Sequence, residues 1–343
     1  NRLALPLAVI ALAFLLACTT SKTPIPAPSL APAATAISTA QLVASPTATI
    51  VATPTPTATL VPPTPTPSPT PTPVKPGSSA PPDRDLYALA ARLVLKSGQP
   101  IPRVVNPEPV SYATGRRDTF QVTDIPNGRV HLVTATIQLV TEHAYWYVDD
   151  GVRFSKSDLE RSALRFEEAI YPRITKVFGQ ELAPGIDNDV HLTILHTPLN
   201  GVAGYFSAAD EYPIEVHPQS NQREMIYIDT SGLPLGSESY LGTLAHEFTH
   251  AVQFRADPAE EGWVNEGLAE FGKELAGYTP SFQGAFFSSL PVSLTAWPVD
   301  LGSTAPYYGA ASLFMEYLAQ QFGAASLRRL LEEPTNGVQG MEK

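Results

Sequence analysis

Between residues 83 and 235 the apolar positions mostly follow the spacing of β-strands. Alternating or continuously apolar runs, rich in β-branched and aromatic side chains, predict strands at residues 119–123, 129–142, 143–149, 189–196, 202–207 and 225–229. We expect the strand at 202–207 to lie at a sheet edge. Helical spacing at 83–96 and 157–179 interrupts the pattern. Ser157 with Glu160 three residues later predicts a capping box, and Gly179 ends that helix.

After residue 235 the apolar spacing becomes helical. It predicts a helix from about 236 to 255, a second at 264–278, a third at 309–323, and the start of a tail at 328–333. In the first helix Ser237 or Ser239 is the expected N-cap, and Leu244, Phe248 and Ala251 form one packing stripe. Strands come first and helices last, an order that predicts an α+β fold.

The first 82 residues have a different composition and predict no packed core. Residues 1–18 join a basic start to an apolar run and end at Cys18, the pattern of a signal peptide with a lipobox. Cys18 is the only cysteine, so we expect it to be lipidated; the alternative is a plain signal peptide or anchor. Residues 19–82 are rich in Pro and Thr and predict a disordered, extended spacer. We also expect the C-terminus to be truncated.

Charged residues lie almost entirely in residues 83–343. All 33 acidic residues occur there, whereas three of the 22 basic residues, Arg2, Lys22 and Lys75, precede it. This part therefore holds 19 basic and 33 acidic residues, a net charge of −14. Such a charge argues against nucleic acid as a partner and against electrostatic adhesion to anionic lipid. Membrane contact is expected through the lipid anchor only, with the domain outside the cytoplasm at the cell surface, or secreted.

The run from His246 to His250 reads His-Glu-Phe-Thr-His, an HExxH motif on the first C-terminal helix. Residues four apart share a helix face, so both imidazoles can bind one zinc ion. A third ligand must come from elsewhere, and Glu266 at the start of the next helix can supply it. Glu247 lies beside the same face and is a candidate general base. The simpler interpretation is a solvated helix face that matches the motif by chance.

Together with Asn265, Glu266 and Glu270, the motif resembles the gluzincin metallopeptidases, the thermolysin-like clan with HExxH and a downstream glutamate. The resemblance covers roughly residues 200–275, and the whole chain looks most like bacterial surface lipoproteins with a peptidase-like domain. It implies a zincin-like fold, in which a mixed β-sheet precedes the motif helix and a helical subdomain follows. It also implies one Zn²⁺ per chain, held by His246, His250 and Glu266, and hydrolysis of peptide bonds.

The resemblance also assigns supporting roles near the zinc ligands. Glu270 is expected to accept the second ring N–H of a ligand histidine, although the family has aspartate there, and Asn265 accompanies it. The gluzincin pattern places a Tyr or His oxyanion donor after the glutamate helix, and Tyr308 is the candidate, with Tyr307 beside it. The alternative is that both tyrosines only pack at a helix start.

Two rival functions remain open from the sequence. One is a surface module that keeps a structural zinc without catalysis, and the other is a zinc hydrolase of another bond class. Side chains of calcium-binding type also occur, but their spacing supports no calcium site; they are Asp210, Glu211, Asn221 and Asp229. The expected partner is a peptide or protein substrate.

Overall fold

The computed structural model describes residues 15–17, 85–96, 99–289, 291–298 and 301–343, which belong to one compact unit. Cys18 and the Pro/Thr-rich spacer lie outside the described residues, as does most of the expected signal peptide, so the lipid anchor and the spacer stay predictions. Among the described residues, no helix combines the length and the apolar character needed to cross a bilayer.

A mixed sheet forms the first layer, with the strand order β1-β6-β7-β5-β4-β3-β2. The strands are β1 (Leu15–Ala17), β2 (Arg117–Asp124), β3 (Arg129–Val140), β4 (Ala144–Asp149), β5 (Leu192–Thr197), β6 (Gly204–Ser207) and β7 (Met225–Asp229). The central strands β4, β5 and β7 run parallel, and the outer pairings are antiparallel. The sequence predicts β6 at the sheet edge, but β1 lies beyond it, so β6 is the outermost strand of residues 85–343 only.

Alternate residues of β4 face two separate cores, because successive side chains in a strand point to opposite sides. Trp146 belongs to the larger core, which the helices cover. Tyr145 and Tyr147 belong to a smaller core on the other face, built from the sheet's own side chains. Since both faces are covered, β4, β5 and β7 are buried almost throughout, which explains their continuous apolar sequences.

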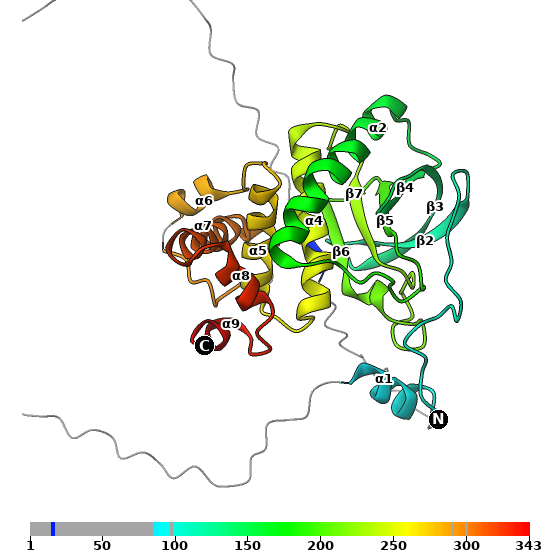
Figure 1. The fold of residues 1–343 in the computed structure, drawn as a ribbon, viewed down its shortest axis with the longest axis horizontal. Helices are drawn as coiled ribbons and strands as arrows, with labels where there is room; N and C mark the ends of the chain where they lie inside the picture. The colour runs from blue at the N-terminus through cyan, green and yellow to red at the C-terminus, as the bar shows by residue number, and fades with distance from the viewer. Residues whose placement is uncertain (1–14, 18–84, 97–98, 290, 299–300) are drawn as a thin grey trace, which may run out of the picture. The chain divides into compact units, whose positions relative to one another are not determined.

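Helices form the second layer and the C-terminal part. They are α1 (Leu86–Leu89), α2 (Lys156–Arg165), α3 (Tyr171–Phe178), α4 (Glu238–Ala256), α5 (Gly262–Leu275), α6 (Gln283–Ser288), α7 (Ala305–Phe322), α8 (Ala324–Leu331) and α9 (Gly337–Met341). In Figure 1, α4 lies between the sheet and the yellow-to-red helices α5–α9. It packs on β6 and β7 on one side and on α5 on the other. This arrangement confirms the α+β class.

Two glycines let α5 approach its neighbours closely. A Cβ on Gly272 would lie 2.1 Å from Thr249 Oγ1 of α4, and one on Gly267 would lie 2.8 Å from Met315 Cγ of α7. Real side chains do not reach such distances, so any larger residue would push the helices apart. Gly272 therefore sets the distance between the motif helix and α5, which carries Glu266, and Gly267 sets the distance between α5 and α7.

Several predicted boundaries are wrong by a few residues. The helix expected at 157–179 starts at Lys156, because its N-cap is Ser155, two residues before the expected Ser157. A π-helical turn at Phe166–Ile170 then separates α2 from α3. The strand expected from Asp189 begins at Leu192, since the backbone N–H groups of Asp189 and His191 donate to aspartate side chains in a turn. The tail at 328–333 belongs to α8, and the expected helix at 83–96 is shortened to α1 and a π turn at Ala90–Val94.

Candidate metal centre

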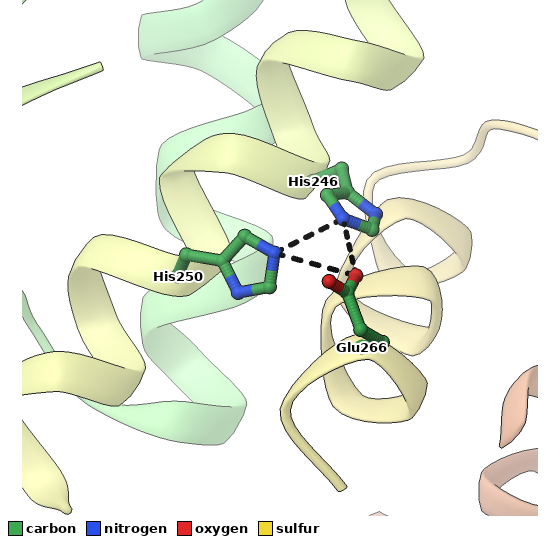
Figure 2. A group of neighbouring side chains, drawn as sticks. All are labelled: His246, His250 and Glu266. Carbon is green, nitrogen blue, oxygen red and sulfur yellow. Dashed lines mark hydrogen bonds and ion pairs between the residues drawn. The ribbon is translucent and has the colours of Figure 1, made fainter. Parts of the chain in front are cut away.

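The motif helix α4 begins at a side-chain cap and presents both histidines toward α5. Ser237 Oγ accepts from the backbone N–H of Tyr240 at 3.2 Å, which confirms one of the two expected caps. His246 and His250 lie one turn apart and are each 1% exposed. Figure 2 shows the two rings and the Glu266 carboxylate, which comes from α5, converging on one point. The sequence-predicted ligand set is therefore assembled in space.

Three ligand atoms form a small triangle at this point. Nε2 of His246 lies 3.0 Å from Nε2 of His250 and 3.2 Å from Oε2 of Glu266, and the third side measures 3.7 Å. Among the described residues, this is the one group of three or more His, Cys, Asp or Glu side chains with the spacing of a metal site. The buried group can hold a metal ion.

Each imidazole has a polar neighbour at its Nδ1 nitrogen. His250 Nδ1–H donates to Gln253 Oε1 at 2.6 Å, and Gln253 Nε2 donates to the carbonyl of Asn265 at 2.7 Å. Glu270 Oε1 lies 3.0 Å from Nδ1 of His246. With the protons on Nδ1, both Nε2 lone pairs point at each other across 3.0 Å. Two lone pairs so placed repel, and a cation between them removes the repulsion.

The Glu270 carboxylate has further partners on the loop after α5. Its Oε2 accepts from the backbone N–H of Ser281 and lies 3.8 Å from Lys273 Nζ. Lys273 also donates to Ser281 Oγ at 2.5 Å. Burial raises the pKa of Glu270, but the contacts with His246 and Lys273 outweigh burial and lower it below its usual value. Glu270 is thus held as an anion next to His246.

Burial and contacts also set the charge of the ligands themselves. Burial raises the pKa of Glu266, yet the two imidazoles outweigh this effect and bring it to about 2. Desolvation lowers the pKa of His250. Near neutral pH, Glu266 is therefore a carboxylate and His250 a neutral imidazole. These are the protonation states that metal binding requires.

Glu247 is fully buried and lies between α4 and the edge strand. A Cβ on Gly204, the first residue of β6, would lie 3.0 Å from Glu247 Cγ and 2.8 Å from the carbonyl oxygen of Tyr227. Glycine at position 204 therefore lets β6 pass directly over the Glu247 side chain.

A cavity of about 370 Å³ opens beside the metal ligands. His246 and Thr243 of α4 form one side, Lys273 of α5 another, and the loop at 278–282 a third. The cavity gives solvent and a bound molecule access to the edge of the metal site. It is large enough for one amino-acid side chain.

Tyr308 also lies near the metal ligands. It is 2% exposed, and its ring centre is 6.4 Å from that of His246. The ring packs on Trp297 at 5.3 Å and on Phe282 at 5.8 Å. Contrary to expectation, Tyr308 lies inside the first turn of α7, because that helix begins at Ala305. Tyr307 is less buried and contacts Trp297. The oxyanion role of Tyr308 stays a prediction.

Gln253 is the site residue that the sequence interpretation missed. It lies three residues after His250 on the same helix, so the helical spacing rule alone places it beside that ring. Asn265 supports the site through its backbone: its carbonyl accepts from Gln253, which in turn accepts from the His250 ring. The Asn265 amide donates to the carbonyl of Glu260 at 3.2 Å and supports the turn before α5.

No protein-family model and no curated protein matches the chain. The functional interpretation therefore depends on the site itself.

Proposed function

We propose that this chain is a zinc-dependent peptidase of gluzincin type with a zincin-like fold. The observation that carries the proposal is the triangle of His246, His250 and Glu266 ligand atoms, with Glu247 on the same helix. The sheet followed by a motif helix and a helical C-terminal part agrees with that fold class. The lipid-anchored, extracytoplasmic location is part of the same proposal and depends on the sequence around Cys18 alone.

Zinc is the metal that fits the ligand set. Two imidazole nitrogens with one carboxylate oxygen is a common catalytic zinc set, and tetrahedral zinc bonds of about 2.0–2.1 Å place ligand atoms about 3.3 Å apart. The observed separations of 3.0, 3.2 and 3.7 Å bracket this value. Each ring is also oriented by an outer partner, as zinc-binding histidines require.

Residues of the chain have separate roles in the proposed reaction. A zinc ion here would supply Lewis acidity that polarises the substrate carbonyl and makes a water molecule acidic near neutral pH. Glu247 takes the proton of the attacking water and passes it to the leaving amine. Tyr308 donates a hydrogen bond to the developing oxyanion. Glu270 and Gln253 hold the two imidazoles in the ligand tautomer.

Peptide bonds are the proposed substrate because of the edge strand. An extended peptide can add to a free strand edge through main-chain hydrogen bonds. The outer side of β6 receives Leu15–Ala17 as an antiparallel strand, so this edge accepts an extended segment. Gly204 lets the face of the same strand lie against Glu247. The side chain of a bound residue would enter the 370 Å³ cavity beside His246.

The two rival functions predict different sites. A purely structural zinc is usually enclosed by four protein ligands. Within the described residues the metal group contains three, and an open cavity reaches His246. These features favour catalysis over a structural role. A hydrolase of another bond class would use the same zinc site, and the edge strand is the feature that favours peptides.

Glu247→Gln tests the proposal. Glutamine keeps the shape of the side chain but cannot accept the proton, so peptidase activity should fall about 10²- to 10⁴-fold. Zinc content by mass spectrometry and the melting temperature should stay at the parent values. Glu215→Gln, at an exposed position, is the matched control and should keep full activity. Parent-level cleavage of a casein or peptide library by Glu247→Gln would refute the mechanism.

A further inference from the structure

A second group of buried acidic side chains lies outside the metal centre. Glu211 ends the short 3₁₀ helix Ala208–Glu211 that follows β6, and Glu224 immediately precedes β7. Their carboxyl groups lie within hydrogen-bond reach of each other. Asp187, from the loop before β5, adds a third carboxylate nearby. Three segments distant in sequence thus bring acidic groups to one place.

This pair is buried without a compensating cation. Glu211 is 6% exposed and Glu224 is 3% exposed. Within the described residues neither makes an ion pair, and Glu211 Oε2 has no hydrogen-bond donor. Arg223 is the nearby basic residue, but its guanidinium contacts Asp118 at 3.6 Å and the Tyr147 hydroxyl at 3.5 Å. A buried carboxylate in this state is costly unless something else neutralises it.

The backbone around Glu224 is arranged to receive its carboxylate. Glu224 Oε1 accepts from the backbone N–H of Ile186 at 2.8 Å. A Cβ on Gly185 would lie 1.4 Å from Glu224 Oε2, so no larger residue fits at position 185 while the carboxylate stays in place. The carboxylate is therefore fixed in position, within hydrogen-bond reach of Glu211.

Two species can neutralise such a pair, a shared proton or a metal cation. A shared proton removes one negative charge. The surroundings hold more than that, because Asp187 and Asp210 also lie near Glu211 and Arg223 supplies one positive charge. A divalent cation compensates this group of charges better than one proton. It also gives Glu211 Oε2 the partner that no N–H or O–H provides.

We propose that Glu211 and Glu224 bind a calcium ion at a structural site separate from the zinc centre. The named ligands are carboxylates only, and hard oxygen ligands without histidine or cysteine select Ca²⁺ over transition metals. Calcium takes six to eight oxygens, so backbone carbonyls and water complete its coordination. The ion would tie the loop at 184–189 to the start of β7 and to the segment that follows β6. Since β6 runs over Glu247, calcium would stabilise the substrate edge from its far end.

Calcium titration of the full chain at constant ionic strength and pH 7.5 tests the site. The protein is first depleted of metal and then reloaded with one equivalent of zinc. Calcium at a hundred times its dissociation constant should raise the melting temperature by roughly 5–10 °C. Glu211→Gln and Glu224→Gln should each weaken calcium binding at least tenfold by calorimetry. Glu215→Gln, an exposed carboxylate in the same β6–β7 connection, should behave like the parent. His250→Ala should keep the calcium response, which separates this site from the zinc site.

The opposite pattern would overturn the proposal. If calcium neither binds nor raises the melting temperature of the parent, and Glu211→Gln stabilises the protein to the same extent with and without calcium, the two glutamates share a proton instead. Calcium binding that persists unchanged in both variants would place the ion elsewhere. Should Glu224→Gln fail to fold, binding by the parent and by Glu211→Gln decides the question.

Discussion

Glu266 and Glu224 are equally buried glutamates with opposite electrostatic behaviour. Each is 3% exposed, yet the pKa of Glu266 is about 2 and that of Glu224 is about 7. Desolvation raises the pKa of both. Glu266 faces two imidazoles, which favour its charged form enough to outweigh burial. At Glu224 burial outweighs the hydrogen bonds with Glu211 and the Ile186 backbone, which lower the pKa, and the nearby Asp187 raises it further. At equal burial, the strength of the partners therefore decides whether a carboxylate stays charged.

The two sites therefore also differ in the protonation states that they adopt without metal. At the candidate metal centre the contacts with the two imidazoles favour the charged form of Glu266, so the three groups are ready in their metal-binding forms. At the acidic pair, one group must take up a proton whenever no cation is present. We therefore expect the two sites to respond differently to mutation, to outer contacts and to pH.

Glu266→Ala should have the largest effect. Removing the carboxylate leaves two histidine ligands, and zinc content measured by mass spectrometry after dialysis should fall from about one ion per chain to near zero. Activity should disappear with the metal. His217→Ala, outside the ligand triangle, should retain both. Full zinc in Glu266→Ala would mean that another residue is the third ligand.

Gln253→Ala should have an intermediate effect on the same site. Gln253 accepts the His250 Nδ1–H and connects it to the Asn265 carbonyl, so its loss frees the ring to rotate or change tautomer. Loss of such an outer contact typically lowers metal affinity about 10- to 100-fold. Competition with a chelating dye measures this. An unchanged zinc affinity would show that packing alone orients His250. Gln283→Ala removes a glutamine on α6 that contacts Ser312 and Glu316 and serves as the control.

Much of this structure follows from the sequence, and the exceptions have physical causes. The β7 strand and the motif helix were predicted closely because their apolar patterns are strong. The π turn at Phe166–Ile170 leaves no such pattern, so α2 and α3 read as one helix. The positions of His246 and His250 were predictable because HExxH fixes their spacing on one helix. Glu211 and Glu224 are thirteen residues apart on a loop without a repeat, so only folding reveals that they meet.

The pH dependence of stability should give the smallest effect and the sharpest test of the comparison. Without calcium, the pKa of Glu224 lies above its unfolded value of 4.5, at about 7. The contribution of Glu224 to the free energy of unfolding is therefore fully present below pH 4.5. It is lost as the pH rises toward 7, by at most about 1.4 kcal/mol per pH unit. The double variant Glu211→Gln/Glu224→Gln should lack this pH dependence of stability. Burial lowers the pKa of His196 to about 4, so His196 contributes the opposite slope in the same range, but it contributes equally to parent and variant.

The free energy of unfolding in urea is measured for the parent and for the double variant from pH 4.5 to 7. The difference between the two proteins at each pH gives the contribution of the carboxyl pair. Saturating calcium should reverse the sign of that difference, because calcium binds the deprotonated carboxylates and its affinity rises with pH. The parent should then gain stability relative to the variant as the pH increases. A difference that is flat in both conditions would mean that the pair neither takes up a proton nor binds the ion, and that its contrast with Glu266 is wrong.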